Sequence, residues 1–465
     1  MPGTTVRREH DSLGDIDVPA NAYYGAQTVR AVQNFPISGI PIAHHPSLLR
    51  ALALVKQAAA IANKSLGILS ADKCHAIVQA SQEVIDGKHA GEFPIDVFQG
   101  GAGTSTNMNM NEVIAARGRE LLGRPRDDVA ALHANDDVNL SQSTNDAYPT
   151  AVRLAMLLST GQLSVGLGGL AAAFDERAAL FAHVVKLGRT QLQDAVPMTL
   201  GQELGAYADT IREDIARLRE ASLLLHEVNL GGTAIGTRIN ADPAYGPLAI
   251  AELARRSGFA LVQSGNLVEA SWDMGGFVMF SGVLKRIATK LSKIANDLRL
   301  LSSGPRGGIG EIALPAMQPG SSIMPGKVNP VIPEVMNLVC FQVIGNDLAV
   351  TMAAEGGQLQ LNAFEPLICH NILTSISLLA NAVGTFTTRC VAGITAREDV
   401  CARHVENSVS TVTALVPLLG YERAAALAQT ALATNRTIRE LAREALSMSD
   451  ADLDDVLSPI RLARA

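Results

Sequence analysis

The sequence predicts a mainly α-helical protein, and three observations support that fold class. Aromatic residues make up only 4% of the 465 residues, so the core must consist of Ala, Leu, Val and Ile, which suits closely packed helices. Long stretches repeat apolar residues at a helical heptad spacing, whereas the alternation typical of half-buried strands is sparse. At a soft prior of about 150 residues per domain, the length predicts about three domains.

The first predicted domain spans residues 1–142. Its first forty residues are rich in glycine and proline, which predicts an extended or irregular lead-in. Residues 47–65 have the pattern of an amphipathic helix, with Ser47 as a plausible N-cap. Small polar residues crowd into residues 100–112 and, across the domain boundary, into residues 141–150, where caps and turns are expected.

The second predicted domain, residues 143–397, carries the strongest helical signal. One apolar seam keeps a 4-3 spacing for about three heptads, at Phe280, Leu284, Ile287, Leu291, Ile294, Leu298 and Leu301. A shorter seam repeats the spacing at Ile211, Ile215, Leu218, Ser222 and Leu225. Residues 335–355 are apolar nearly all round, which predicts a helix buried on every side. These patterns predict a long-helix bundle whose helices also pack against other subunits.

The third predicted domain, residues 398–465, is a smaller helical piece. Its segment SMSDADLDD, residues 447–455, has an acidic N-cap signal that predicts a last short helix.

The composition argues against several classes of protein. A net charge of −7 argues against a general nucleic-acid binder. The chain has no uninterrupted run of roughly 18 apolar residues and no apolar N-terminal stretch of signal-peptide length, so we expect neither a membrane span nor a membrane partner. Five widely spaced cysteines without a C-x-x-C pair predict neither disulfides nor a zinc site, and favour a cytoplasmic location. The mean hydropathy of +0.18 then indicates buried subunit interfaces.

The segment from Gly320 to Pro330 looks like a phosphate-binding loop at first sight, but the match fails. Five residues separate Gly320 from Gly326, where a phosphate loop has four, and Val328 follows Lys327 where a hydroxyl residue is required. No complete dinucleotide or zinc-protease motif is present, so ATP, dinucleotide and zinc chemistry have little support.

Four segments instead concentrate small hydrogen-bond donors. They are Thr104–Asn107, Ser143–Asn145, Thr190–Gln191, and Ser321 and Ser322 with Lys327 and Asn329. Neutral hydroxyl and amide groups with one lysine suit the binding of small carboxylates. Each segment taken alone is better explained as a cap or turn, but four of them in an apolar chain favour a binding site.

The segment GSSIMPGKVNP resembles the signature loop of the fumarase/aspartase superfamily, whose members eliminate a group from a succinyl skeleton to give fumarate. Further blocks resemble the family in the expected order over nearly the whole chain, among them DVFQGGAGTSTNMNMNEV, NDDVNLSQSTNDAYPT and GRTQLQDAVPMTLGQE. The resemblance implies a three-domain fold whose central long-helix bundle forms a tetramer core. It also implies a small dicarboxylate substrate, active sites shared by three subunits of a homotetramer, and no required cofactor; activation by Mg²⁺ is compatible with it.

Within the superfamily, the residues favour the aspartase branch. Gln191 stands where class II fumarases usually carry His, and Tyr23 and Tyr24 stand near the start of the block where fumarases usually carry Trp. Arg238 and Leu140 depart from the common pattern, where Gly and Lys are frequent. The alternatives are therefore a class II fumarase and a carbon–nitrogen lyase for a modified aspartate. A structural, non-enzymatic role is a further alternative, against which the intact signature loop counts.

The resemblance implies the reversible anti elimination of ammonia from L-aspartate through an enediolate (aci-carboxylate) intermediate. Ser321 would be the general base, activated as an alkoxide when the mobile loop closes. The same resemblance assigns the α-carboxylate to Thr190, Lys327 and Asn329, the β-carboxylate to Ser143, Thr144 and Ser322, and the amino group to Thr104 and Asn145 with Gln191 alongside. Because Gln191 cannot titrate, the His–Glu relay of fumarases, which would use Glu334, should be absent or altered.

Overall fold

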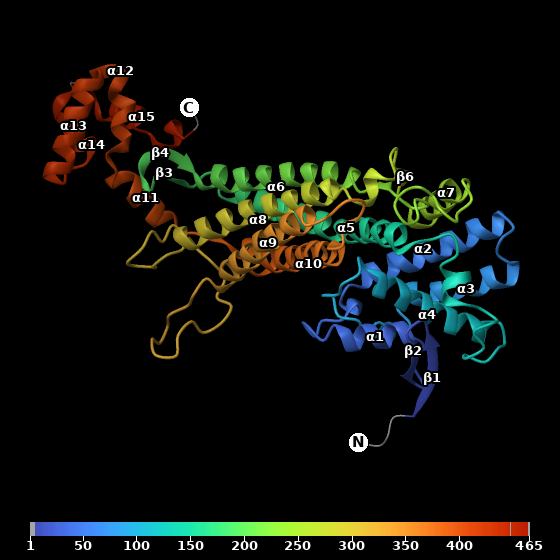
Figure 1. Cartoon of the computed structure of the whole chain (residues 1–465). Helices are drawn as coiled ribbons and strands as arrows, with labels where there is room; N and C mark the ends of the chain where they lie inside the picture. The colour runs from blue at the N-terminus through green and yellow to red at the C-terminus, as the bar shows by residue number, and fades with distance from the viewer. Residues whose placement is uncertain (1–4, 447, 464–465) are drawn as a thin grey trace. The chain divides into compact units, whose positions relative to one another are not determined.

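The computed structural model describes residues 5–446 and 448–463, and most of these lie in α-helices, which confirms the predicted fold class (Figure 1). The chain forms two compact units. Unit 1 consists of Met1–Leu163, Arg217–Lys285 and Gln342–Leu378, and unit 2 consists of Ser164–Ala216, Arg286–Phe341 and Leu379–Ala465. The division into three domains at residues 142 and 397 stays a prediction.

Five long helices have one part in each unit: α5 (Thr144–Leu180), α6 (Leu200–Leu223), α8 (Gly275–Leu301), α9 (Val331–Glu355) and α10 (Glu365–Arg389). Five helices lie wholly in unit 1: α1 (Ala26–Asn34), α2 (Pro46–Ser65), α3 (Ala71–Ile85), α4 (Thr104–Leu121) and α7 (Tyr245–Ser257). Six lie wholly in unit 2: α11 (Glu398–Asn407), α12 (Val416–Leu419), α13 (Tyr421–Thr434), α14 (Ile438–Ala445), α15 (Asp450–Val456) and α16 (Pro459–Leu462).

The described strands form four two-stranded sheets. Three are antiparallel, and they pair β1 (Val6–Asp11) with β2 (Gly14–Pro19), β3 (Val185–Thr190) with β4 (Gln193–Thr199), and β7 (Ile312–Ala313) with β8 (Thr395–Ala396). The fourth pairs β5 (Glu227–Val228) with β6 (Val262–Gln263) in parallel. Single turns of 3-10 helix occur at Ile42–His44, Ala90–Glu92, Glu269–Ser271 and Val391–Gly393, a longer one at Val409–Leu415, and a π-helical turn at Ala134–Val138.

The N-terminal lead-in is more regular than predicted. Strands β1 and β2 form a hairpin and α1 follows it, so the segment is extended but not irregular. The two strands alternate between exposed and half-buried residues. The sequence does not reveal β1 because four of its six side chains are charged rather than apolar.

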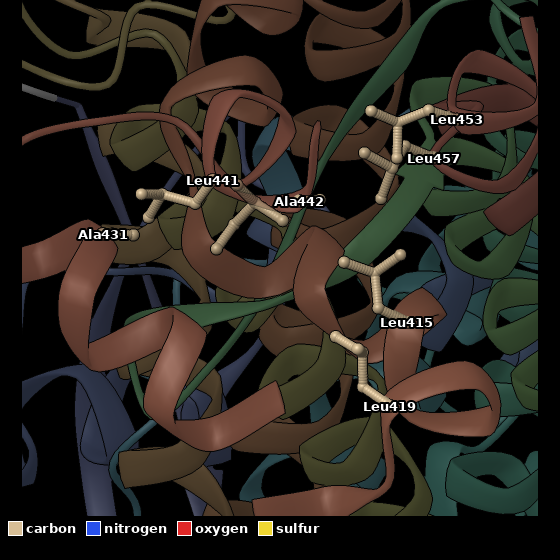
Figure 2. Close-up of a cluster of buried hydrophobic side chains, with 8 residues drawn as sticks. Leu415, Leu419, Ala431, Leu441, Ala442, Leu453 and Leu457 are labelled. Atoms are coloured by element: carbon tan, nitrogen blue, oxygen red, sulfur yellow. The ribbon is translucent and has the colours of Figure 1, made fainter. Parts of the chain in front are cut away.

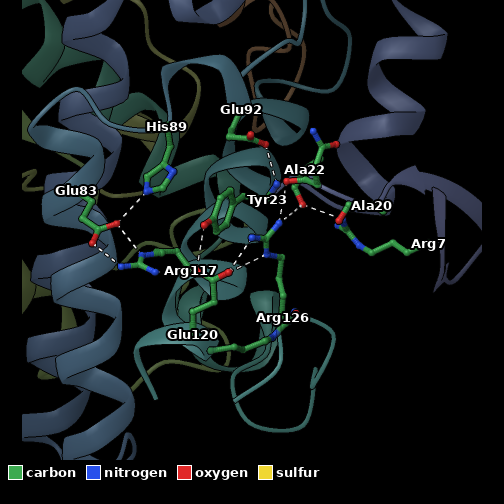
Figure 3. Close-up of polar contacts among 12 residues, drawn as sticks. Arg7, Ala20, Ala22, Tyr23, Glu83, His89, Glu92, Arg117, Glu120 and Arg126 are labelled. Atoms are coloured by element: carbon green, nitrogen blue, oxygen red, sulfur yellow. Dashed lines mark hydrogen bonds and ion pairs between the residues drawn. The ribbon is translucent and has the colours of Figure 1, made fainter. Parts of the chain in front are cut away.

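A polar network ties the segment after this hairpin to helices α3 and α4 (Figure 3). The hydroxyl of Tyr23 donates a hydrogen bond to Glu120 at 3.0 Å. The guanidinium of Arg126 lies 3.9 Å from the centroid of the Tyr23 ring. Arg117 pairs with Glu83 at 2.8 Å and with Glu120 at 2.7 Å. The hydrogen bond from Arg117 holds the pKa of Glu83 at about 2, so this carboxylate stays charged.

Helix α2 begins slightly earlier than predicted, and His45 rather than Ser47 is its N-cap residue. Pro46 occupies the first turn, where its fixed φ fits the helix and its missing N–H removes no hydrogen bond. The helix is buried on most sides, and its buried residues include Lys56.

The predicted heptad seam of α8 is confirmed. All seven of its apolar residues are buried, from Phe280 through Leu301. Helices of the bundle run alongside one another (Figure 1). Their contacts join Phe174 of α5 with Tyr207 of α6, Tyr207 with Asp297 of α8, Ser281 of α8 with Asp347 of α9, and Asn346 of α9 with Ser375 of α10.

The seam predicted for residues 211–225 is only partly right. Ile215 and Ser222 are half-buried, and Asp214 is fully buried beside them. Asp214 is tolerated at this position because Lys290 and Arg286 of α8 lie 3.2 and 3.3 Å from its carboxylate. A search for apolar residues alone does not find a charged residue in a seam.

Within a single chain, helix α9 is not buried on every side, and its burial in an assembly stays a prediction. Four of its apolar side chains are between 58% and 66% exposed in the single chain: Leu338, Phe341, Leu348 and Met352. Their spacing of three, seven and four residues places them on one face of the helix. The described part of the chain supplies nothing that covers this face.

Three helical segments are long and apolar enough to cross a membrane by length and composition: Thr144–Leu180, Val331–Glu355 and Glu365–Gly393. The expectation of no membrane span rested on uninterrupted apolar runs, and isolated polar residues break each of these. In α9, one such residue is Asp347, which is buried and accepts from Ser281 at 2.8 Å and from Lys285 at 2.6 Å.

The small helices near the C-terminus share one apolar core (Figure 2). It consists of Leu415, Leu419, Ala431, Ile438, Leu441, Ala442, Leu453 and Leu457. Ser449 caps α15 by accepting from the N–H of Asp452, which confirms a capped helix in the acidic segment. The start of that segment, Ser447, lies outside the described residues, and α16 follows α15, so the capped helix is not the last.

Candidate functional site

The ten predicted site residues lie in four stretches of chain, which we describe as three groups. The helix-terminus group, in unit 1, consists of Thr104, Ser143, Thr144 and Asn145. The hairpin group, in unit 2, consists of Thr190 and Gln191. The loop group, also in unit 2, consists of Ser321, Ser322, Lys327 and Asn329. Among residues 5–446 and 448–463, no hydrogen bond joins one group to another.

The helix-terminus group sits at the first turns of two helices. Helix α4 begins at Thr104 and α5 begins at Thr144. Ser143 accepts from the N–H of Asn145 at 3.2 Å, and its own N–H donates to Asp146 at 2.9 Å. This reciprocal arrangement is a helix cap, so the same residues serve as cap and as candidate ligands. The positive ends of both helix dipoles favour an anion at this group.

A buried lysine lies behind this group, and the sequence analysis missed it. Lys56 of α2 is fully buried and donates to the side-chain oxygens of Asn107, Asn139 and Gln142 at 2.7, 3.1 and 2.8 Å. Asn107 in turn donates to the hydroxyl of Thr144 at 3.1 Å. A chain of two hydrogen bonds therefore connects Lys56 to a predicted site residue.

The surroundings of Lys56 act on its charge in two directions. Burial lowers the pKa of Lys56 to about 7. The three amide oxygens match the three N–H groups of an ammonium, and an anion bound nearby would favour that charged form further. The only sequence signal was one lysine inside an apolar helical run, which does not identify its partners.

Asp146 fixes the helix-terminus group to a second loop. Its carboxylate is fully buried and accepts from the backbone N–H groups of Ser143, Gly231 and Thr233 at 2.9, 3.0 and 2.9 Å. Burial raises its pKa to about 6, although these three donors favour the charged form. The amide of Asn145 also donates to the carbonyl of Ala234 at 2.8 Å, so the loop is held on both sides.

Gly103 has no side chain, and this allows the chain to place Thr104 at the start of α4. Replacing Gly103 tests this requirement. Gly103 precedes α4 with a φ of +87°, and a Cβ there would lie 2.6 Å from the ring of Tyr148. We expect Gly103→Ala to lower the free energy of unfolding by about 2 kcal/mol or more, from the clash together with the strained φ. The measurement is guanidinium denaturation of both forms.

Gly101→Ala is the matched control for this prediction. Gly101 has a similar φ of +92°, but its nearest neighbour to a Cβ is Thr104 at 3.9 Å. The control carries the same backbone strain without the clash, so it should be clearly more stable than Gly103→Ala. Equal stabilities would show that Tyr148 makes room for the added methyl group.

The hairpin group forms a strained turn between β3 and β4. Gln191 and Leu192 both have left-handed backbone angles, with φ of 53° and 63°. This pattern is that of a two-residue hairpin turn in which Asn and Gly are normally preferred. Strain of this kind costs of order 1 kcal/mol or more per residue and is typical of functional sites. The turn leaves Thr190 and Gln191 exposed at the hairpin tip.

The loop group surrounds a hydroxyl that is prepared to carry negative charge. Ser321 Oγ accepts from the backbone N–H groups of Ile323 and Met324 at 3.2 and 2.9 Å. Gly320 closes the base of the loop by donating its N–H to the carbonyl of Lys327 at 2.9 Å. Asn329 donates its amide to the carbonyl of Gly320 at 2.7 Å. Two N–H donors to one oxygen stabilise an alkoxide there.

The described residues do not bring together three His, Cys, Asp or Glu side chains that could hold a metal ion. The five cysteines are all free and buried.

Comparisons with known proteins agree on one family. A family model described as "Lyase" matches residues 14–345, and one described as "Fumarase C C-terminus" matches residues 412–464. The chain is 60% identical to an aspartate ammonia-lyase of Pseudomonas fluorescens, over 97% of this chain and 95% of that protein. It is 49% identical to an aspartate ammonia-lyase of Escherichia coli K12, with the same coverage.

Solved structures give the same result for the fold. A fumarate lyase:delta crystallin of Brucella melitensis bound to cobalt is 61% identical and superposes with a TM-score of 0.97, covering 99% of this chain and 100% of that one. A class II fumarase of Schistosoma mansoni is 35% identical and superposes with a TM-score of 0.95, covering 99% of both chains.

Proposed function

Because this chain belongs to the lyase family of enzymes, we propose that it acts as an aspartate ammonia-lyase, which eliminates ammonia from L-aspartate to give fumarate. The observation that carries the proposal is the near-full-length similarity to relatives of that activity. Gln191 at the hairpin tip supports the choice within the family, because an amide cannot replace the titrating histidine that is usual in class II fumarases.

The reaction begins at the loop group. Ser321 as an alkoxide takes a proton from Cβ of the substrate, and the β-carboxylate accepts the electron pair as an enediolate. The C–N bond then breaks, its electron pair leaves with nitrogen as ammonia, and the double bond of fumarate forms. The N–H groups of Ile323 and Met324 support the alkoxide. No cofactor is needed in this proposal, because the β-carboxylate itself holds the electrons.

The helix-terminus group suits the carboxylate whose charge grows. Ser143 and Thr144 would donate to the β-carboxylate, with Ser322 of the loop group. The positive ends of α4 and α5 and the buried Lys56 favour the extra negative charge of the enediolate. Preorganised donors of this kind contribute several kcal/mol to transition-state stabilisation.

The opposite end of the substrate would be held by the remaining residues. Thr190, Lys327 and Asn329 would bind the α-carboxylate, where the lysine supplies the only full positive charge of the three. Thr104 and Asn145 would contact the amino group.

We also propose a homotetramer in which three subunits contribute to each active site. No hydrogen bond of the described residues joins the three groups within one chain, and α9 exposes an apolar face that water would not cover favourably. Neighbouring subunits would cover this face. The same contacts between subunits would explain why three helices are apolar enough to cross a membrane although no lipid surrounds them. A cytoplasmic location is consistent with the five free, buried cysteines.

The test of the activity is a comparison of two substrates. Purified protein is incubated with L-aspartate and, separately, with L-malate, and fumarate is followed by its ultraviolet absorbance. We expect fumarate from L-aspartate with release of ammonia, and little from L-malate. Turnover of L-malate alone would instead identify a class II fumarase. The structural similarity to the class II fumarase of Schistosoma mansoni is the reason to test this alternative.

A further inference from the structure

A buried carboxylate in unit 2 is related to two of the three site groups, the hairpin group through its ion pairs and the loop group through the chain that follows it. Glu311 is fully buried and lies just before β7. Lys186 Nζ and Arg189 Nη1 of β3 lie 3.1 and 2.9 Å from its oxygens, and His404 Nδ1 of α11 lies 3.1 Å away. The sequence analysis gave no role to any of these four residues.

The strand β3 is shaped so that both of its cations reach the same carboxylate. Lys186 and Arg189 are three residues apart, and in a regular strand they would point to opposite faces. The pairing register of β3 with β4 shifts between Leu187 and Arg189, where a step of two residues in β3 is matched by three residues in β4, so the extra residue lies in β4 opposite Gly188. Such an irregularity increases the local twist, and Lys186 and Arg189 on either side of it both reach Glu311.

The irregularity opposite Gly188 also depends on the absence of a side chain. A Cβ on this residue would lie 2.8 Å from the carbonyl oxygen of Val196 in β4. The sheet therefore has a local irregularity opposite Gly188, where a side chain would not fit, and the cations on either side of Gly188 both contact Glu311. Arg189 directly precedes Thr190 and the strained turn at Gln191.

The backbone of Glu311 is fixed as firmly as its side chain. Its N–H donates to the carbonyl of Leu301 at 2.9 Å, and its carbonyl accepts from the N–H of Arg397 at 2.8 Å and from Cys401 Sγ at 3.6 Å. From this anchored residue, the chain runs through ten positions to Ser321. One residue thus holds both the hairpin group and the start of the segment that carries the loop group.

The charges of the cluster keep Glu311 ionised. Burial alone would raise the pKa of Glu311, but attraction to Lys186, His404 and Arg189 holds it below its ordinary value. Lys186 also lies 2.8 Å from Glu203 of α6, so two carboxylates face two permanent cations. Loss of the charge on Glu311 would leave Arg189 without its buried partner.

We propose that Glu311 is a positioning residue, which holds Arg189 and thereby keeps Thr190 and Gln191 and the Ser321 segment in the geometry that the reaction requires. This inference rests on the proposed function, because it assigns no catalytic contact to Glu311 itself. A strained turn relaxes when its anchor is removed, so the tip residues move although the hairpin stays folded. Displacement of binding groups by about 1 Å can lower a rate by about 10²-fold.

The test compares three variants and one double variant. Glu311→Gln keeps the shape and removes the charge, and Arg189→Met removes the partner. Each is expected to lower kcat/KM by about 10²-fold, and the double variant to be no slower than the slower single variant, because both act through one contact. Glu203→Gln is the matched control: it removes a carboxylate from Lys186 without touching Arg189, and kcat should stay within about twofold.

A structural readout separates this inference from the proposed function. Hydrogen–deuterium exchange should become faster in residues 186–194 and 314–330 of Glu311→Gln, and remain as in the wild type in Glu203→Gln. Unchanged exchange in both segments, or additive losses of about 10⁴-fold in the double variant, would overturn the positioning role. If the wild type converts neither L-aspartate nor L-malate, the proposed function has failed, and the exchange measurement still decides the role of Glu311.

Discussion

Ser321→Ala abolishes ammonia elimination, by about 10³-fold or more, while the protein keeps its fold and its assembly. The substitution removes the only oxygen of the loop that receives two backbone N–H donors, and with it the proposed base. The hydroxyl of Ser322 receives no such donors among the described residues. The measurement is fumarate formation from L-aspartate, together with the circular dichroism spectrum and the mass of the assembly in solution.

A mixing experiment makes this prediction sharper. Ser321→Ala and Thr144→Val change residues of different groups, so both homotetramers should be nearly inactive. If each site draws these groups from different subunits, hybrid tetramers formed by dissociation and reassociation should regain about one quarter of the wild-type activity. Substantial activity of Ser321→Ala alone would show that another group takes the proton. A complete lack of recovery would mean that one subunit supplies both groups.

The second large effect is expected from Lys56→Met, which should lower both the free energy of unfolding and kcat/KM. Methionine fills a similar volume, but it leaves the side-chain oxygens of Asn107, Asn139 and Gln142 buried without their common donor. We expect the free energy of unfolding to fall by about 3 kcal/mol. Loss of the positive charge that a bound anion would favour on Lys56 behind Thr144 should lower kcat/KM by about 10²-fold.

The pH dependence of the unfolding free energy tests whether the buried, titrating amino group of Lys56 causes these effects. Burial lowers the pKa of Lys56 from 10.5 to about 7, so between these values the unfolded chain binds a proton that the folded lysine does not. The stability contributed by this group is therefore present at high pH and is lost as the pH falls toward 7, at about 1.4 kcal/mol per pH unit. Guanidinium denaturation at pH values of about 7.5 and 9 should show this slope in the wild type and not in Lys56→Met.

Lys64→Met is the control for this variant. Lys64 lies in the last turn of the same helix and is exposed. Its replacement removes an equal charge from the surface, and the unfolding free energy should stay within about 0.5 kcal/mol of the wild type. A Lys56→Met protein as stable as this control would mean that the three amides rearrange to satisfy one another.

The parts of this molecule that follow from local periodicity are the parts that the sequence predicts well. The seam of α8 is such a case, because a single repeat decides which residues face the core, and all seven are buried. The turn-forming segments were also found, since Thr104 and Ser143 do lie at helix starts. Burial of α9 on every side was not found within the single chain, because periodicity reports apolarity and not which molecule covers it.

Contacts between distant segments could not be predicted in the same way. Lys56 meets residues 51, 83 and 86 positions away, and nothing in its own helix identifies them. Glu311 meets Arg189 and His404, each more than 90 positions away in sequence. Such pairs depend on how helices and loops are packed, so one sequence without structure offers only the residue types. The roles of the ten site residues accordingly remain proposals.

The left-handed turn at Gln191 and Leu192 sets a trade-off for anyone who wishes to make this protein more heat-resistant. Standard stabilisation would replace the pair with Asn and Gly, which adopt these angles without strain. That change would also shorten the side chain at residue 191 by one methylene group, and so draw back the amide proposed to lie beside the leaving nitrogen. Thermal stability and substrate choice therefore place opposite requirements on residues 191 and 192, and an improvement in one is gained at the expense of the other.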